Sequence, residues 1–215
     1  MKNKISTREE IISKFHDGQT IAIGGFGRGG RPNRLLGCLA DSGAKDLTLI
    51  IIDPARPGSA FDPLFRSGQV KKLIVAHIGK HPAVMDAVSA GTVQAEFCPM
   101  GTLVERVRCG GMGLGGILTK TGLGTVVEDG KQIVEVNGSS FLVETALRAD
   151  ISLTYARRSD PMGNLAYHGT SKSSNSIFVS CADLSIVEAD FLLEVNELPM
   201  DEIETPGIFV DMLLA

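Results

Sequence analysis

A short glycine-rich segment constrains this chain more than any other part of its sequence. The segment TIAIGGFGRGGRP starts with an apolar run, residues 20–23, whose composition is typical of a buried strand. Five of the next seven residues are glycine, and Phe26 and Arg28 stand between them. Pro32 follows, where the first turn of a helix is expected. A strand, a glycine loop and a helix in this order favour a loop whose backbone N–H groups face an anion or a carbonyl oxygen.

The spacing of the glycines distinguishes this loop from two common nucleotide-binding motifs. A P-loop needs Lys followed by Ser or Thr, but Arg31 and Pro32 stand there. A dinucleotide-binding fingerprint has no matching register, and Asp41, a possible ribose ligand, falls at the expected end of the helix. A glycine-rich loop can serve simply to turn the chain, but a single turn needs fewer than five glycines. We therefore expect residues 24–30 to face a ligand. Arg28 fits a substrate carboxylate, a phosphate or a solvated loop charge equally well.

Apolar runs that alternate with amphipathic stretches predict the fold class. Ser6 to Glu10 offer a capping box for an N-terminal helix that reaches Phe15. This alternation favours an open, mostly parallel α/β sheet with helices on both faces. We expect strands at 20–24, 47–52, 73–77 and 93–98, and helices at 32–41, 82–90 and 102–108.

The pattern changes after Thr125 and predicts a small antiparallel β insertion. Its expected strands are 125–128, 132–136 and 141–144, with Asn137-Gly138 as a tight hairpin turn. Segments 151–155, 177–181 and 185–187 are then expected to return to the main sheet as strands. Because no linker, repeat or low-complexity segment interrupts the sequence, we expect residues 1–215 to form one domain.

Composition and charge exclude several classes of protein. A net charge of −4 gives no support for nucleic-acid binding, and no apolar run approaches the ~20 residues of a membrane span. The polar start MKNKISTREE lacks the apolar centre of a signal peptide, so we expect a cytoplasmic protein. The four cysteines lack C-x-x-C spacing, which favours buried free thiols over disulfides or a zinc site: Cys38, Cys98, Cys109 and Cys181.

Four polar residues outside the glycine loop are candidates for a functional role. His77 and His81 are four residues apart, but Gly79 and Pro82 break any helix between them, so we expect no metal pair. Glu105 is a candidate catalytic carboxylate, although an ion pair with a neighbouring arginine is the interpretation we favour. Asn175 is expected in a loop near the ligand-binding end of the sheet.

The pattern D-G-x-x, three apolar residues, then G-G-F-x-x-x-G-x-P runs from Asp17 to Pro32. It resembles the N-terminal signature of the alpha subunit of family I coenzyme A transferases. Segment 99–111, PMGTLVERVRCGG, and segment 121–125, TGLGT, are similar to two further blocks of that family. The similarity runs nearly from end to end of the chain and includes, near the C-terminus, Asp150, Asp160, Gly163-Asn164 and Thr205-Pro206-Gly207.

The resemblance implies an alpha subunit that transfers CoA between short-chain carboxylic acids of the acetate, butyrate or acetoacetate type. It implies a beta subunit as partner, in a heterodimer or heterotetramer, and CoA as acyl-CoA substrate with no tightly bound cofactor and no metal. The family's nucleophile is a glutamate of the beta subunit, in a motif similar to S-E-N-G, which forms a glutamyl-CoA thioester. This chain lacks that motif, so no catalytic residue is expected in it. The expected CoA-binding residues are Gly24, Gly25, Phe26, Gly27, Arg28, Gly29 and Gly30.

The chain departs from the family pattern at three places. The family often has an asparagine after the strand at 47–52, where this chain reads Ile51-Ile52-Asp53-Pro54 and departs at Ile52. Met100 replaces a glutamine. Ser173-Ser174 lies within a segment that reads A-R-N-F-N in the family. These changes leave open an acyl-CoA hydrolase or a carbon–carbon lyase subunit. The glycine loop is also compatible with a non-enzymatic module that senses a CoA ester or sugar phosphate, and with a sugar-phosphate isomerase.

Overall fold

The fold is built around one large sheet, seen in a computed structural model that describes residues 3–215. Its strands lie in the order β11-β10-β8-β1-β2-β3-β4, and β9 pairs with β8 to complete eight strands. All neighbours along this order are parallel, and only the short β9 runs antiparallel to its neighbour. The strands are Thr20–Ile23 (β1), Leu47–Ile51 (β2), Val70–Val75 (β3), Gln94–Phe97 (β4), Ala149–Ser159 (β8), Leu165–Ala166 (β9), Ala182–Leu192 (β10) and Met212–Leu214 (β11).

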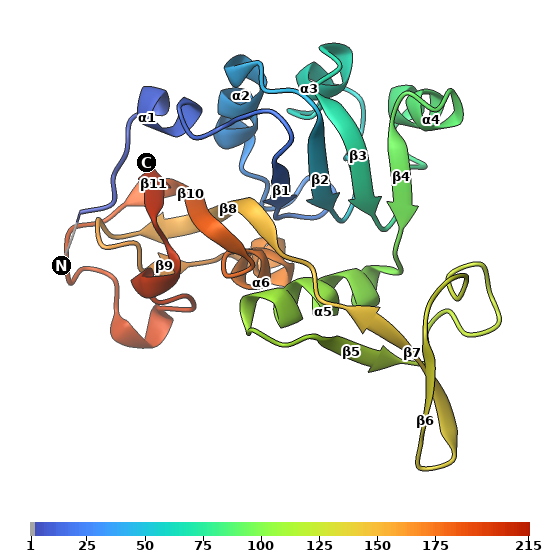
Figure 1. The fold of residues 1–215 in the computed structure, drawn as a ribbon. Coiled ribbons are helices and arrows are strands. Elements are labelled where there is room, and N and C mark those ends of the chain that lie inside the picture. Colours follow the sequence, from blue (N-terminus) through green and yellow to red (C-terminus); the bar gives the residue numbers. More distant parts are fainter. Residues whose placement is uncertain (1–2) are drawn as a thin grey trace.

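Helices cover both faces of this sheet, as expected (Figure 1). Alternate residues of one strand show the two faces: Ile21 and Ile23 belong to one apolar cluster, whereas Ala22 belongs to the other. The first cluster is closed by Arg8–Ile12 (α1), Asn33–Ser42 (α2), Asp62–Arg66 (α3) and Pro82–Ser89 (α4). The second is closed by Met100–Gly111 (α5) and Asn175–Phe178 (α6).

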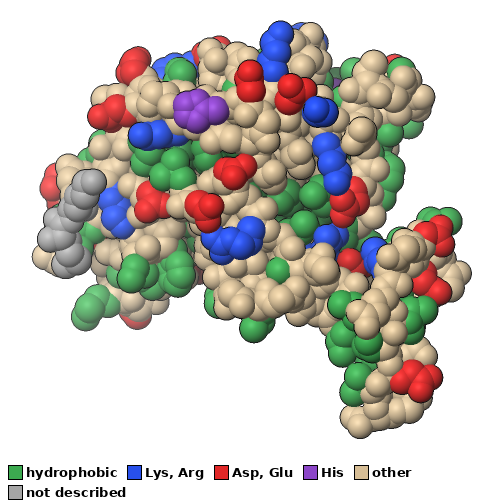
Figure 2. All heavy atoms as spheres, viewed as in Figure 1, with side chains coloured by type: hydrophobic (Ala, Val, Ile, Leu, Met, Phe, Trp, Pro, Cys, Tyr) green, Lys and Arg blue, Asp and Glu red, His purple; other side chains and the backbone are tan. Residues whose placement is uncertain are grey.

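The β insertion is a separate three-stranded sheet that projects from the main body (Figure 1). Its strands, Gly116–Thr119 (β5), Ile133–Val136 (β6) and Ser139–Thr145 (β7), pair antiparallel in the order β5-β7-β6. Asn137 and Gly138 both have positive φ, as the expected hairpin turn requires. Apolar side chains gather on this projecting part (Figure 2), including the exposed Leu118 and Ile133.

Two of the strand predictions are wrong. Segment 125–128 forms turns and bends, and the third strand of the insertion is β5, which begins at the second of two adjacent glycines. Segment 177–181 belongs to α6 and the turn after it, since Phe178 packs into the apolar cluster that α5 closes. The described residues also form three short 3₁₀ helices, at Gly169–Ser173 (η1), Met200–Glu202 (η2) and Gly207–Phe209 (η3).

The N-terminal capping box is confirmed. The Thr7 side chain accepts a hydrogen bond from the Glu10 amide, and the Glu10 carboxylate accepts one from the Thr7 amide. The helix it starts, α1, is shorter than expected and ends before Phe15. All four cysteine side chains are buried. Within residues 3–215, every helix is too short or too polar to cross a bilayer.

Candidate functional site

The glycine loop, residues 24–30, follows β1 at the point where the order of strands reverses. From β1 the chain builds outward through β2, β3 and β4, then returns to place β8 on the other side of β1. Ligands of open α/β sheets bind in the crevice at the carboxyl ends of the strands at such a reversal. The fold therefore puts the glycine loop at the place where a binding site is expected.

The glycines of the loop are required by close packing as much as by turns. A Cβ on Gly24 would lie 2.1 Å from Asn175 Oδ1, and one on Gly29 would lie 2.2 Å from Thr170 Oγ1. Gly25 has φ +94°, where any other residue would be strained. Only Gly27, with φ +57°, combines a positive φ with open space around it. The loop thus packs closely against segment 169–175. No local pattern in the sequence indicates this contact.

Most amides of the loop already donate hydrogen bonds within the protein. Phe26 and Gly29 exchange two backbone bonds and form a tight hairpin. The amides of three more loop residues, Gly24, Gly25 and Gly27, also donate hydrogen bonds. Their acceptors are Leu153 O, Ser174 Oγ and Asp53 Oδ2, in that order. Within residues 3–215, the amides of Arg28 and Gly30 have no such acceptor. Only these two amides remain for a ligand, fewer than the sequence suggests.

Asn175 fixes the loop to its surroundings. Its fully buried side chain donates from Nδ2 to Gly30 O and Ser171 O, both at 2.9 Å. Its Oδ1 accepts from the amide of Tyr155 in β8 at 3.0 Å. One amide group therefore joins β8, η1 and the glycine loop. Asn175 is the first residue of α6 and does not lie in a loop as predicted, and its hydrogen bonds give it a structural role beside the glycine loop.

The N-terminus of α2 holds an anion that belongs to the protein itself. Glu188 of β10 accepts hydrogen bonds from the amides of Arg34, at 2.7 Å, and Leu35, at 3.0 Å. Burial raises the pKa of Glu188, and these two hydrogen bonds and the charge of Arg34 oppose that rise. The helix dipole is thus matched by an internal carboxylate, which takes the position that an anionic ligand would have used.

A buried ion pair between Arg31 and Asp53 stabilises the glycine loop. Arg31 Nη2 lies 2.9 Å from Asp53 Oδ1, and both side chains are 3% exposed. Arg31 also donates from Nε to Gly27 O at 2.7 Å and from Nη2 to Asp53 O at 2.9 Å. Asp53 in turn accepts from the amides of Gly27 and Ala55. This pair connects the loop after β1 to the loop after β2.

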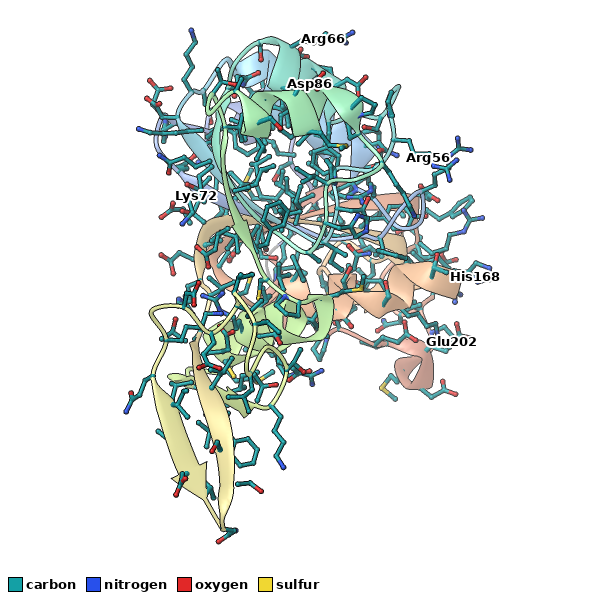
Figure 3. All side chains as sticks on the ribbon, turned by 90° about the vertical axis from the view of Figure 1, so that its right-hand side faces the viewer. Arg56, Arg66, Lys72, Asp86, His168 and Glu202 are labelled. Atoms are coloured by element: carbon teal, nitrogen blue, oxygen red, sulfur yellow. The ribbon has the colours of Figure 1, made fainter. Side chains whose placement is uncertain are left out.

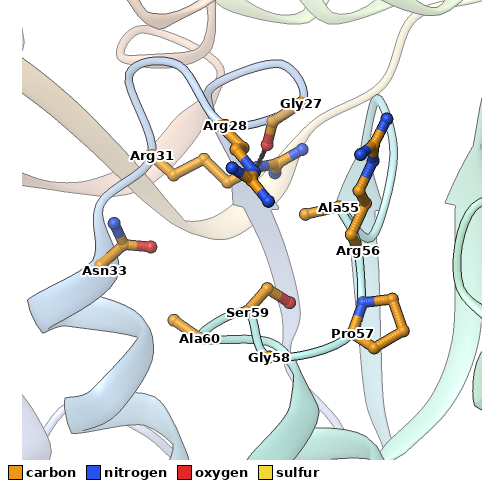
Figure 4. A pocket seen from close by; sticks show the side chains of 10 residues that line it. All are labelled: Gly27, Arg28, Arg31, Asn33, Ala55, Arg56, Pro57, Gly58, Ser59 and Ala60. Carbon is orange, nitrogen blue, oxygen red and sulfur yellow. Dashed lines mark hydrogen bonds between the residues drawn. The ribbon is translucent and has the colours of Figure 1, made fainter.

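A pocket of about 430 Å³ opens between these two loops (Figure 4). Arg28 and Arg31 line it from the glycine loop side, and the exposed Arg56 lies at its edge, on the loop after β2. An adjoining hollow of about 250 Å³ adds Lys80 and Asp53 to this group. The larger pocket has no acidic side chain in its lining: Gly27, Arg28, Arg31, Asn33, Ala55, Arg56, Pro57, Gly58, Ser59 and Ala60. We call it the arginine pocket.

The remaining polar candidates lie outside this pocket. Glu105 forms an ion pair with Arg108 at 3.1 Å on α5, and both side chains are about half exposed, which agrees with the structural role that the sequence favours. His81 is the residue directly before α4, and its Nε2 lies 3.0 Å from Asp62 Oδ1. Across the described residues, no group of three potential His, Cys, Asp or Glu ligands gathers around one point.

Comparison with known proteins identifies the family. The family model described as coenzyme A transferase matches residues 5–215. The chain belongs to the coenzyme A transferase family. It is 44% identical over 214 residues to the acetate CoA-transferase subunit alpha of Escherichia coli K12, with 100% of this chain and 97% of that protein covered. It is 40% identical over 214 residues to the acetoacetyl-CoA:acetate/butyrate CoA transferase alpha subunit of Clostridium acetobutylicum, with 100% and 98% covered.

The fold of this coenzyme A transferase chain also matches a solved structure. An acyl-CoA transferase from Escherichia coli O157:H7, in a thioester complex with CoA, superposes with a TM-score of 0.88 at 20% identity. The match covers 100% of this chain and 47% of that protein. At this identity the likeness establishes the fold alone.

Several motif residues of this transferase chain act in packing. A Cβ on Gly110 would lie 2.0 Å from Leu147 O, so the glycines that end α5 allow it to approach the segment between β7 and β8. Asp160 accepts bonds from the amides of Met162 and Asn164, while Asn164 Oδ1 accepts from the amide of Gly207. These hydrogen bonds bring Asp160, Asn164 and Gly207, which belong to separate motifs of the sequence, into contact at one place in the fold.

The sequence does not reveal how three residues shape the site: Asp53, Ser174 and Glu188. Asp53 stands out in the sequence only as part of segment 51–54, where the chain departs from the family, yet it holds Arg31 and Gly27. The position of Asp53 directly after an apolar strand is the one signal that points to it. Ser174 and Glu188 reach the loop region from segments about 150 residues away, at separations of 149 and 154. No local pattern connects residues so far apart.

Proposed function

We propose that this chain is the alpha subunit of a heteromeric transferase that moves CoA between short-chain carboxylic acids. The alpha subunits to which it is 44% and 40% identical are named for acetate and for acetoacetyl-CoA with acetate or butyrate. The proposed binding residues are Gly24 to Gly30, which form one wall of the arginine pocket through Gly27 and Arg28. CoA enters as the acyl-CoA substrate.

The observation that carries the proposal is a cationic pocket without a free nucleophile. Asp53 lines the adjoining hollow, and both of its oxygens are occupied by Arg31, Gly27 and Ala55. The Ser59 hydroxyl lies 3.2 Å from Asp62 Oδ1, not beside an imidazole that would remove its proton. A pocket of this kind binds anions, but it does not attack a thioester. The attacking carboxylate therefore comes from a partner chain.

The proposed chemistry proceeds in two steps on the partner's glutamate. Its carboxylate attacks the thioester carbonyl, CoA leaves as thiolate, and an anhydride forms. The thiolate then attacks the glutamyl carbonyl of the anhydride, which releases the acid and leaves a glutamyl-CoA thioester; the second acid reverses both steps. Each attack places negative charge on an oxygen. This chain contributes the free backbone amides of Arg28 and Gly30 to that region.

Reconstitution with the partner tests the proposal. The isolated chain should show no transfer of CoA from acetyl-CoA to butyrate, and activity should appear when a beta subunit is added. Activity of the isolated chain would refute the proposal. A complex that only hydrolyses acyl-CoA, or that binds it without turnover, would favour the hydrolase or the sensing module instead.

A second experiment asks which chain carries the covalent intermediate. We expect Glu105→Gln, in the reconstituted complex, to form the same enzyme–CoA adduct as the wild type, because Glu105 is paired with Arg108 on α5, away from the arginine pocket. The adduct is trapped with borohydride or hydroxylamine and located by mass spectrometry. Modification found on Glu105 of the wild-type complex would overturn the subunit assignment.

A further inference from the structure

The arginine pocket has more positive charge than the protein itself neutralises. Arg31 is paired with Asp53. In the part of the chain that the structure describes, no carboxylate lies within ion-pair distance of Arg28, Arg56 or Lys80. Three cations thus surround the pocket and its adjoining hollow without an internal counter-ion. Such a group binds an anion of more than one charge.

Arg31 adds a buried donor that has no acceptor. Its Nη1 is buried and has no hydrogen-bond partner among the described residues, although Nε and Nη2 are both used. The ring of Phe61 lies 5.0 Å from the guanidinium carbon and offers no conventional acceptor. Burial lowers the pKa of Arg31, and the charge of Asp53 opposes that effect. A buried guanidinium with one free nitrogen, in the lining of a cationic pocket, lacks one acceptor.

The number of donors favours a phosphate over a carboxylate. A short-chain carboxylate has one charge and is fully bound by one bidentate arginine. A phosphate monoester has close to two charges and three terminal oxygens, and planar guanidinium groups match these oxygens well. The N-terminus of α2 cannot bind the phosphate, because Glu188 already accepts hydrogen bonds from its amides. Side chains must therefore supply the positive charge, which explains why three arginines gather here.

We infer that the arginine pocket binds a phosphate of the nucleotide portion of CoA, between Arg28, Arg31 and Arg56. This inference rests on the proposed function for the identity of the ligand. The acyl end of the bound molecule then extends from the pocket toward the partner subunit that supplies the nucleophile. The short-chain acid is bound elsewhere in the complex. The arginine side chains of the pocket thus serve substrate binding and take no part in the chemical step.

Binding measurements on the reconstituted complex test this inference. The probes are CoA, adenosine 3′,5′-bisphosphate, inorganic phosphate and acetate, titrated by calorimetry at low and at moderate salt. The variants are Arg28→Gln and Arg56→Gln, and the matched control is Arg66→Gln. Arg66 is an exposed arginine of α3 outside the pocket lining, and it lies well apart from Arg56 (Figure 3).

We expect each pocket variant to weaken binding of adenosine 3′,5′-bisphosphate about tenfold, the usual effect of one lost charge-assisted hydrogen bond. The KM for acyl-CoA should rise with it, and the KM for acetate should not. Added salt should weaken wild-type binding, and Arg66→Gln should bind as the wild type does. Inorganic phosphate should bind more weakly than the bisphosphate.

Three results would overturn the inference. Unchanged bisphosphate binding in both pocket variants would show that no phosphate binds there. A rise in the KM for acetate alone would make the pocket the acid site. Equal affinity for inorganic phosphate and the bisphosphate would show a free-phosphate site. The proposed function can fail independently of this inference. In that case the wild-type complex transfers no CoA, but Arg28→Gln and Arg56→Gln still weaken bisphosphate binding.

Discussion

Replacement of Asn175 by aspartate tests how the glycine loop is held. The change keeps the shape and the oxygen that accepts from Tyr155, but it removes the two N–H donors to Gly30 O and Ser171 O. Each lost bond costs about 1 kcal/mol net, and a buried carbonyl left unpaired costs about 1–3 kcal/mol. Two such bonds give an expected loss of about 2–5 kcal/mol in the free energy of unfolding. That is a large part of the ~5–15 kcal/mol that stabilises a typical domain.

Urea unfolding followed by circular dichroism measures this loss at about pH 7 and again at about pH 5. The loss should shrink at the lower pH, because a protonated aspartate donates one bond again. Burial raises the pKa of such a carboxyl, so the regained stability is present below that pKa and disappears as the pH rises through it. Ser173→Ala, at an exposed neighbour whose hydroxyl has no hydrogen bond among the described residues, is the control. A loss below ~0.5 kcal/mol for Asn175→Asp would refute our account of the loop.

Two further predictions concern carboxylates outside the arginine pocket. Glu188→Ala leaves the amides of Arg34 and Leu35 without their acceptor. We therefore expect the free energy of unfolding, measured in urea, to fall by about 1–2 kcal/mol, and by less for Glu188→Gln. Equal losses in the two variants would contradict the capping role. Burial opposes ionisation of Glu96, but bonds from Lys72 and Arg106 outweigh it and lower the pKa of Glu96. The stability this contact gives is present above the ordinary pKa and is lost as the pH falls through the lowered one. Glu96→Gln should therefore flatten the acid side of the curve of Tm against pH, and a curve parallel to the wild type would count against this contact.

The main sheet is predictable because its strands are short apolar runs between glycine-containing turns. The apolar runs 20–24 and 47–52 predict strands, and β1 and β2 match them to within one residue. Segment 177–181 misleads, because an apolar run of this length fits a strand and a buried helix equally well. Its neighbours decide the matter: Ser180 lies against Gly111 of α5, an approach that only tertiary packing explains.

The site is predictable in position and only in part in chemistry. The glycine pattern locates the loop at the carboxyl end of β1, but it suggests that the backbone N–H groups face a ligand. The structure uses five of those seven amides internally and presents arginine side chains instead. Arg56 has no motif to indicate it, because it reaches the pocket through the path of the loop after β2. Contacts of this kind depend on the whole fold and leave no local signal.

The central position of β1 has a consequence for how the chain is made. Ile21 of β1 pairs with Ile151 of β8, and the side chain of Asp150 reaches the amide of Thr20 across a separation of 130 residues. During synthesis β1 can pair early with β2, but its other edge has no neighbour until β8 leaves the ribosome. An unpaired apolar edge of this kind attracts strands of other chains. Chains that terminate before Ala149 should therefore aggregate, whereas the full-length chain protects the same edge within its own sheet.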